Sequence, residues 1–288
     1  MRCRVRGVHC SPATDKSTLQ ARVASATASP EDVGVVDLCI VALKTWQLER
    51  GGVELSALIG PRTLVLPTQN GVDTPTRLGQ LCGCEHVLGG YSRISSFLTA
   101  PGQVTHTSVH PVVQGAGLLP TSGAWCAAEL QRCVAALAPC AHLKIVVEPN
   151  VLHSMWQKLA TMAPFSTLCA AARCPLGPLM EAPESRALVR ACIEETACVA
   201  RACGVELTDS DVQASLNTLA ALPPGVTPSM MRDMLAGRPS ELNEQTGAVV
   251  RLGREKGVPT PVLSVLLSVL LPMERMHRGE LAFPAAVE

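Results

Sequence analysis

The spacing of apolar positions changes near residue 148. Ahead of that point, residues 36–44 (VDLCIVALK) and 63–67 (TLVLP) are nearly continuous apolar runs, as expected for strands buried on both faces. Each run precedes a segment with helical spacing, at residues 47–58 and about 73–81. The succession strand, helix, strand, helix predicts a parallel sheet, and therefore an α/β domain.

Other parts of this first half also show strand and helix signals. Two short segments on either side of a polar turn, residues 5–10 and 19–26, favour a hairpin. Residues 87–110 are rich in Gly, Ser, Thr and Val, with a turn at Pro101-Gly102, and predict strands with a hairpin. We also predict a helix at residues 124–138 and one more strand at residues 143–147.

After Pro149 every segment has the spacing of a helix, and Gly and Pro separate the segments. The predicted helices are residues 151–172, 184–204, 209–222, 228–235, 240–257 and 261–278. We therefore predict an α/β domain at residues 1–148, followed by an all-α domain at residues 149–288.

The composition narrows the classes of partner. Of the 288 residues, 47% are hydrophobic, which is enough for a sizeable core. Lys plus Arg equals Asp plus Glu, at 24 each, and aromatic residues make up only 2%, so neither nucleic acid nor an anionic membrane surface is expected as a partner. No apolar run reaches bilayer length without interruption. A small-molecule ligand or a protein partner is favoured instead.

The thirteen cysteines are scattered through strand-like and helical segments of a chain too long to need disulfide staples. We interpret them as small hydrophobic residues in a reducing compartment. A cytoplasmic location is expected, with an organelle left open. Cys82 and Cys84 form the closest pair, but no histidine or second pair lies at zinc spacing, so no metal site is predicted.

One lysine, Lys158, is set into the long apolar segment at residues 156–177. A charged amine there must reach solvent, find a carboxylate or face a cavity, because leaving it buried and unpaired costs about several kcal/mol. A lysine on a helix is most often a surface residue whose stem lies along apolar neighbours. The helix alone therefore favours the structural interpretation over the catalytic one.

Four other positions carry polar chemistry. Lys44 and Asn70 follow the two apolar strands, and in parallel sheets ligands bind beyond the carboxyl ends of strands. An exposed loop lysine and a turn asparagine are the alternatives. Glu241 is expected in the first turn of the helix at residues 240–257, where the macrodipole favours a carboxylate, and Ser229 is expected to be an N-cap.

Seven motifs, in order and over nearly the whole chain, together resemble the ketopantoate reductase (2-dehydropantoate 2-reductase) family. They are ALKTWQ (42–47), QNG (69–71), VLGGYSRIS with PGQVTH (87–106), WQKLA (156–160), PSMMRD (228–233), GRPSELNEQTG (237–247) and GVPTP (257–261). The resemblance implies a Rossmann-type NADP-binding domain. It also implies a helical C-terminal substrate domain like that of 6-phosphogluconate dehydrogenase, with pantothenate and coenzyme A synthesis as the pathway.

The resemblance also implies roles for particular residues. Lys158 would be the general acid that protonates the carbonyl oxygen of a 2-keto acid substrate, with NADPH as cofactor. Glu241 would hold this lysine and the substrate or cofactor in place, and Ser229 would bind the substrate carboxylate. Lys44 and Asn70 would lie along the cofactor, with Asn70 near the nicotinamide, and Ser95 would contact its backbone. A homodimer is left open.

The chain departs from the family pattern at its beginning. The glycine-rich GxGxxG turn that holds a dinucleotide pyrophosphate has no counterpart in the sequence, and residues 1–6 match the region after the second Rossmann strand. The resemblance thus predicts an N-terminally truncated Rossmann-type domain, in which the apolar strand at residues 36–44 has an open edge.

The chain also departs from the pattern where the family carries asparagines. Met162, Ser166, Leu176 and Val226 stand at those positions. Lost amides predict weak binding of ketopantoate itself, because such a site discriminates through its polar groups. Two hypotheses follow: an NADPH-dependent reductase of ketopantoate or a related 2-keto acid, and a catalytically impaired protein that acts as a dimerisation or protein-binding module.

Overall fold

The computed structural model describes residues 8–12, 19–21, 24–50, 55–101, 103–106, 112–140 and 142–282. The chain divides into two compact units. The first comprises Met1–Gln69 and Thr74–Val151, and the second comprises Asn70–Asp73 and Leu152–Glu288. The short loop Asn70–Asp73 thus belongs with the helical part of the chain, although it lies between two elements of the first unit.

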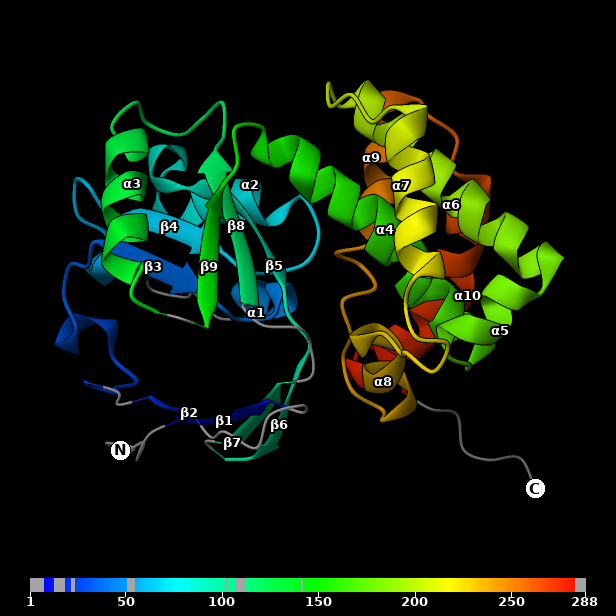
Figure 1. Cartoon of the computed structure of the whole chain (residues 1–288), viewed down its shortest axis with the longest axis horizontal. Helices are drawn as coiled ribbons and strands as arrows, with labels where there is room; N and C mark the ends of the chain where they lie inside the picture. Colours follow the sequence, from blue (N-terminus) through cyan, green and yellow to red (C-terminus); the bar gives the residue numbers. More distant parts are fainter. Residues whose placement is uncertain are drawn as a thin grey trace. The chain divides into compact units, whose positions relative to one another are not determined.

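The first unit is built on strands that run side by side (Figure 1). β3 (Leu38–Val41) and β4 (Leu64–Pro67) pair in parallel, which confirms the predicted parallel arrangement. A parallel bridge from Val65 to Val87 leads to a second group, in which β5 (Leu88–Arg93) is antiparallel to β8 (Val112–Leu118). β8 in turn is parallel to β9 (Leu143–Val147).

A separate sheet of the first unit has the order β2, β1, β7, β6. β1 (Val8–Pro12) pairs antiparallel with β2 (Leu19–Ala21), which confirms the first predicted hairpin where the structure describes it. β6 (Ser96–Ala100) and β7 (Gln103–His106) form the second hairpin.

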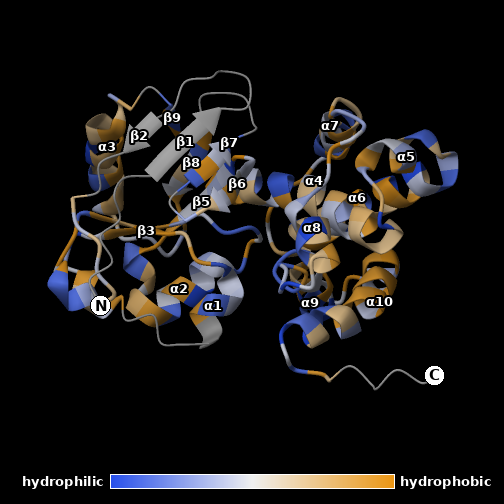
Figure 2. Cartoon of the chain, turned by 90° about the horizontal axis from the view of Figure 1, so that it is seen from below, coloured by the Kyte–Doolittle hydropathy of each residue, from blue (hydrophilic) through white to orange (hydrophobic). Residues whose placement is uncertain are grey.

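The helices of the first unit pack against β4 from two sides. They are α1 (Thr45–Arg50), α2 (Thr74–Cys82) and α3 (Cys126–Leu137), with short 3₁₀ turns at Pro30–Asp32, Ser56–Leu58 and Cys84–His86. Along β4, Val65 joins one buried cluster with Leu48 and Leu78, whereas Leu64 and Leu66 join another with Leu130 of α3. The alternation follows from the two-residue period of a strand. Figure 2 shows the matching division of α3 into hydrophobic and hydrophilic positions.

The prediction that both apolar strands are buried on both faces is right for β4 and wrong for β3. All four residues of β4 are buried. In β3, Cys39 and Val41 are buried, but Ile40 between them is 50% exposed. Within the described residues β3 pairs with β4 alone, so it lies at the edge of its sheet and fewer side chains cover it.

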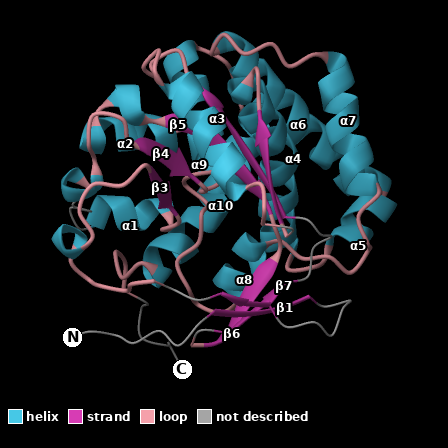
Figure 3. Cartoon of the chain, turned by 60° about the vertical axis from the view of Figure 1, so that its left-hand side comes forward, coloured by secondary structure: helices cyan, strands magenta, loops and turns pink. Residues whose placement is uncertain are grey.

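The second unit contains only helices and loops in its described part (Figure 3). The helices are α4 (Val151–Ala172), α5 (Leu176–Glu181), α6 (Pro183–Ala202), α7 (Asp209–Ala220), α8 (Ser229–Leu235), α9 (Thr246–Lys256) and α10 (Pro261–His277). This α/β plus all-α architecture confirms the predicted fold class. None of the helices in the described residues is both long and apolar enough to cross a membrane.

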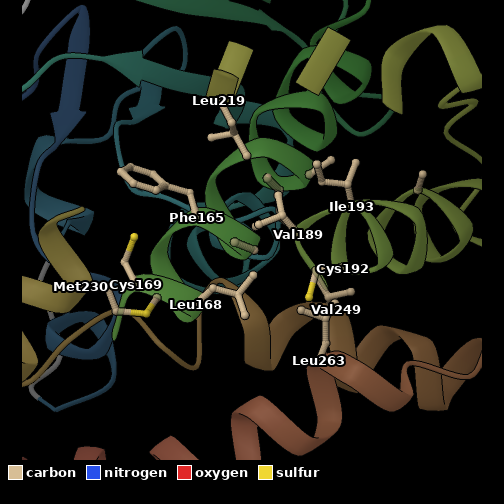
Figure 4. Close-up of a cluster of buried hydrophobic side chains, with 14 of the residues drawn as sticks. Phe165, Leu168, Cys169, Val189, Cys192, Ile193, Leu219, Met230, Val249 and Leu263 are labelled. Carbon is tan, nitrogen blue, oxygen red and sulfur yellow. The ribbon is translucent and has the colours of Figure 1, made fainter. Parts of the chain in front are cut away.

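A single continuous core holds the second unit together (Figure 4). Ile193 and Val189 of α6 are fully buried in this core, and burying each such side chain contributes about 1.5–3 kcal/mol. Cys169 and Cys192 lie in the same core, and burial raises the pKa of both thiols to about 12. These two cysteines therefore stay neutral near pH 7 and pack as small hydrophobic groups.

The sequence-based assignment missed β8 and α5, and it began α9 too early. β8 (VVQGAGL) contains two glycines, which are depleted in strands. Gly115 is needed there, because a Cβ at this position would overlap the ring of Tyr91 on the neighbouring strand. Residues 240–245, predicted to be helical, contain a bend and a turn and no regular helix, and α9 begins at Thr246.

Candidate functional site

Three of the predicted site residues form one hydrogen-bonded chain in the second unit. The ammonium group of Lys158 donates to Oδ1 of Asn70 over 2.8 Å. The Nδ2 of Asn70 donates to Oε2 of Glu241 over 2.9 Å. The amide of Asn70 therefore lies between a cation and an anion, and each of its two polar atoms binds the partner of opposite polarity.

α4 places Lys158 at the edge of the apolar core. Its neighbours Leu159 and Ala160 are each 2% exposed, whereas Lys158 itself is half-buried. Met162, one turn further along the same face, is also half-buried, and Ser166, another turn on, is 1% exposed. The partly open face of α4 thus carries one cation followed by an apolar side chain.

The loop that carries Asn70 is fastened to α9 and to the turn ahead of it. Gly71 has φ of 98°, and a Cβ at this position would overlap the carbonyl oxygen of Glu244. Only glycine fits such a left-handed, close-packed position without strain. Asp73 forms an ion pair with Arg251 of α9. Both contacts hold Asn70 within reach of Lys158.

Glu241 is 4% exposed, and its local structure differs from the prediction. The residue lies in the turns that precede α9, whose N-cap is Gln245, and so it is not in the first turn of a helix. The macrodipole of α9 therefore does not account for the position of the Glu241 carboxylate. The side-chain amide of Asn70 binds this carboxylate, and buried hydrogen bonds of the neighbouring Ser240 hold the backbone beside it.

Ser229 is the first residue of α8, with Pro228 at the N-cap position and no side-chain capping bond. The prediction that Ser229 is the N-cap is therefore wrong. The proline occupies that position because its fixed φ suits an extended residue just ahead of a helix. The half-buried hydroxyl group of Ser229 is thus not needed to cap the helix.

Lys44 and Ser95 belong to the first unit. Lys44 lies in the short connection from β3 to α1, and its backbone N–H donates to Oε1 of Gln47 in the first turn of α1 over 2.8 Å. Gln69 follows β4 and donates its side-chain amide to the Leu43 carbonyl over 2.8 Å, so the two strand ends are tied together. Ser95 lies in the connection between β5 and β6.

The fold and the polar chain define a two-part protein of the α/β plus all-α class. Comparison with known families then gives a more specific result. The profile described as "Ketopantoate reductase PanE/ApbA" matches residues 3–117, and "Ketopantoate reductase PanE/ApbA C terminal" matches residues 150–274. Together the two profiles cover most of the chain. It belongs to the ketopantoate reductase family of oxidoreductases, as the motifs predicted.

Individual relatives agree with this assignment. The chain is 28% identical to 2-dehydropantoate 2-reductase of Vibrio cholerae serotype O1 over 244 residues, 83% of this chain and 78% of the relative. A ketopantoate reductase structure from Ralstonia eutropha JMP134 is 26% identical, with a TM-score of 0.80 over 95% of this chain and 86% of that one. D-mandelate dehydrogenase with NADH and anilino(oxo)acetate has the same fold, at 22% identity and a TM-score of 0.81 over 95% and 86% of the two chains.

Proposed function

We propose that the chain catalyses the NADPH-dependent reduction of 2-dehydropantoate or a related 2-keto acid to the 2-hydroxy acid. The observation that carries this proposal is the hydrogen-bonded chain from Lys158 through Asn70 to Glu241. The amide of Asn70 orients the ammonium group of the half-buried Lys158, and the buried carboxylate of Glu241 orients the amide. Such a fixed ammonium group suits a general acid that must donate to one particular oxygen atom.

In this proposal Lys158 donates a proton to the keto oxygen and stabilises the alkoxide that forms there. An ammonium group has three N–H donors, and the bond to Asn70 uses one of them to set its direction. General acid catalysis contributes about 10²–10⁴-fold, and a preorganised donor at a developing oxyanion about 10²–10³-fold. Glu241 keeps the amide of Asn70 turned so that its oxygen faces the lysine.

Residues 1–148 bind the cofactor in this proposal, and residues 149–288 bind the substrate. Lys44 follows a parallel strand, where open α/β sheets bind nucleotides, and it would contact the cofactor together with Asn70, Ser95 and Glu241. In the described residues, the turn from β3 to α1 has no glycine-rich phosphate cradle. The bound dinucleotide would supply hydride to C2, and Ser229 would bind the substrate carboxylate.

Apolar side chains at two positions where the family carries asparagine favour a 2-keto acid with an apolar substituent. Met162 follows Lys158 on the same face of α4, and it and Val226 are half-buried side chains packed on the core. Neither can hydrogen-bond a substrate hydroxyl group, which weakens discrimination for ketopantoate. The ligand of D-mandelate dehydrogenase in its solved structure, anilino(oxo)acetate, is an aryl-substituted oxo acid, and this supports testing aromatic substrates.

The test is the consumption of NADPH, and in parallel of NADH, with ketopantoate and a panel of aliphatic and aromatic 2-keto acids. We expect reduction by the wild type and a loss of about 10³-fold in kcat for Lys158→Ala. Lys144→Ala, which changes an exposed lysine on β9, is the matched control and should keep full activity. A wild type that reduces none of these acids would contradict the proposal and favour the binding-module hypothesis.

A further inference from the structure

Two charged residues of the last helical turns enclose Ser240, the residue next to Glu241. The N–H of Ser240 donates to both carboxylate oxygens of Glu274, over 3.0 and 3.1 Å, and its hydroxyl donates to Oε2 over 2.6 Å. The carbonyl of Ser240 accepts from Nη2 of Arg278 over 3.1 Å. Arg278 also donates from Nε to Oε1 of Glu274 over 2.6 Å. Every polar group of Ser240 is thus bonded to this pair.

Burial makes this arrangement costly to form. Ser240 and Glu274 are fully buried, and the side chain of Arg278 is 6% exposed. Removing two charges from water costs about several kcal/mol for each, and apolar side chains of similar size often give equal or higher stability. A gain in stability is therefore a weak explanation for the pair. Its geometric effect is a fixed backbone at Ser240.

The same pair reaches the far side of Glu241. Nη2 of Arg278 lies 3.7 Å from Oε2 of Glu244, which is 4% exposed. Within the turn, the N–H of Leu242 donates to the hydroxyl of Ser240 over 3.2 Å. These contacts bracket Glu241 on both sides in a segment that has no regular helix of its own.

We propose that Glu274 and Arg278 are positioning residues that aim the Glu241 carboxylate at Asn70 and, through it, orient Lys158. The proposal rests on the proposed function for its catalytic consequence. If the pair is broken, the turn at residues 240–245 can relax and Asn70 loses a fixed acceptor. A displacement of about 1 Å in such a site can lower the rate about 10²-fold.

The experiment compares Glu274→Gln with Glu195→Gln in the full chain. Glu195 of α6 is a matched control, because its carboxylate accepts from the N–H groups of Val262 and Leu263 at the other end of α10, over 2.8 and 3.0 Å. We expect kcat to fall about 10–100-fold for Glu274→Gln, with the KM for NADPH within about twofold, and to stay unchanged for Glu195→Gln. Thermal unfolding of both variants reports the purely structural effect.

A second readout does not depend on activity. The side-chain amide signal of Asn70 in an ¹⁵N–¹H spectrum, assigned with Asn70→Ala, should shift in Glu274→Gln and stay in place in Glu195→Gln. An unchanged Asn70 signal in Glu274→Gln, or equal losses of kcat in both variants, would overturn the proposal.

If the wild type reduces no keto acid, the proposed function fails, and the Asn70 amide signal alone decides whether Glu274 and Arg278 position Glu241. If Glu274→Gln does not fold, Ser240→Ala replaces it, with an expected loss of about tenfold in kcat and the same shift.

Discussion

The two units differ in how they hold the polar residues of the site. In the second unit, Lys158, Asn70 and Glu241 are joined side chain to side chain across separations of 88 and 171 residues. In the first unit, Lys44 and Ser95 lie in connections that follow the strands β3 and β5. The first arrangement suits groups that must be aimed at one reacting atom, and the second suits contacts along an extended ligand.

This contrast separates the expected kinetic effects. Substitutions in the hydrogen-bonded chain should lower kcat, because they disturb a group that acts in the transition state. Substitutions at the strand ends should raise the KM for the cofactor and leave kcat nearly unchanged, because they remove binding energy that is equal in the ground state and the transition state.

The largest effect in the chain after loss of Lys158 itself is expected for Asn70→Ala. It removes both hydrogen bonds of the amide and leaves a buried carboxylate with one partner fewer. We expect kcat with a 2-keto acid to fall about 10²-fold, measured by steady-state kinetics. Asn217→Ala on the exposed face of α7 is the control. Equal kcat values for the two variants would remove the amide from the mechanism.

A smaller effect is expected for Gly71→Ala. The added methyl group meets the carbonyl of Glu244 at a left-handed backbone position, so the loop must shift and carry Asn70 with it. We expect a loss of about 1–3 kcal/mol in the free energy of unfolding and about tenfold in kcat. Denaturant unfolding and kinetics measure the two effects. Gly204→Ala, also left-handed but with open space around its Cβ position, should lose stability alone.

The smallest effect on turnover is expected for Lys44→Ala in the first unit. The variant should raise the KM for NADPH about tenfold, because one charge-assisted contact to an anionic cofactor is lost. The kcat should change less than about twofold, because this contact is equally strong in the ground state and the transition state. Initial rates at varied NADPH give both constants. A fall in kcat with an unchanged KM would contradict the proposal that Lys44 contributes to cofactor binding and not to the chemical step.

The elements that the sequence predicted well are those with a regular apolar period. β3, β4 and the long helices of the second unit fall where the runs of Val, Leu and Ile place them. β8 was missed because its glycines are chosen for close packing against Tyr91, a tertiary requirement that local propensity contradicts.

The candidate site was predictable only in part. The spacing of residues alone favoured a surface lysine at position 158 and allowed a simple turn residue at Asn70. Only the family motifs indicated that both belong to one site. The partners of Ser240 were missed, because Glu274 and Arg278 stand in the charged last turn of α10, ERMHR, where exposed side chains are common. Their burial and their contacts with Ser240 depend on the tertiary fold.

The most direct test of the account is a double-mutant cycle on kcat between Lys158→Ala and Glu241→Gln. If the two residues act as one unit through Asn70, the double variant should be about as slow as Lys158→Ala alone, because the carboxylate has no lysine left to orient. If the two losses in kcat multiply, Lys158 and Glu241 act independently, and the central claim of a single hydrogen-bonded catalytic chain is contradicted.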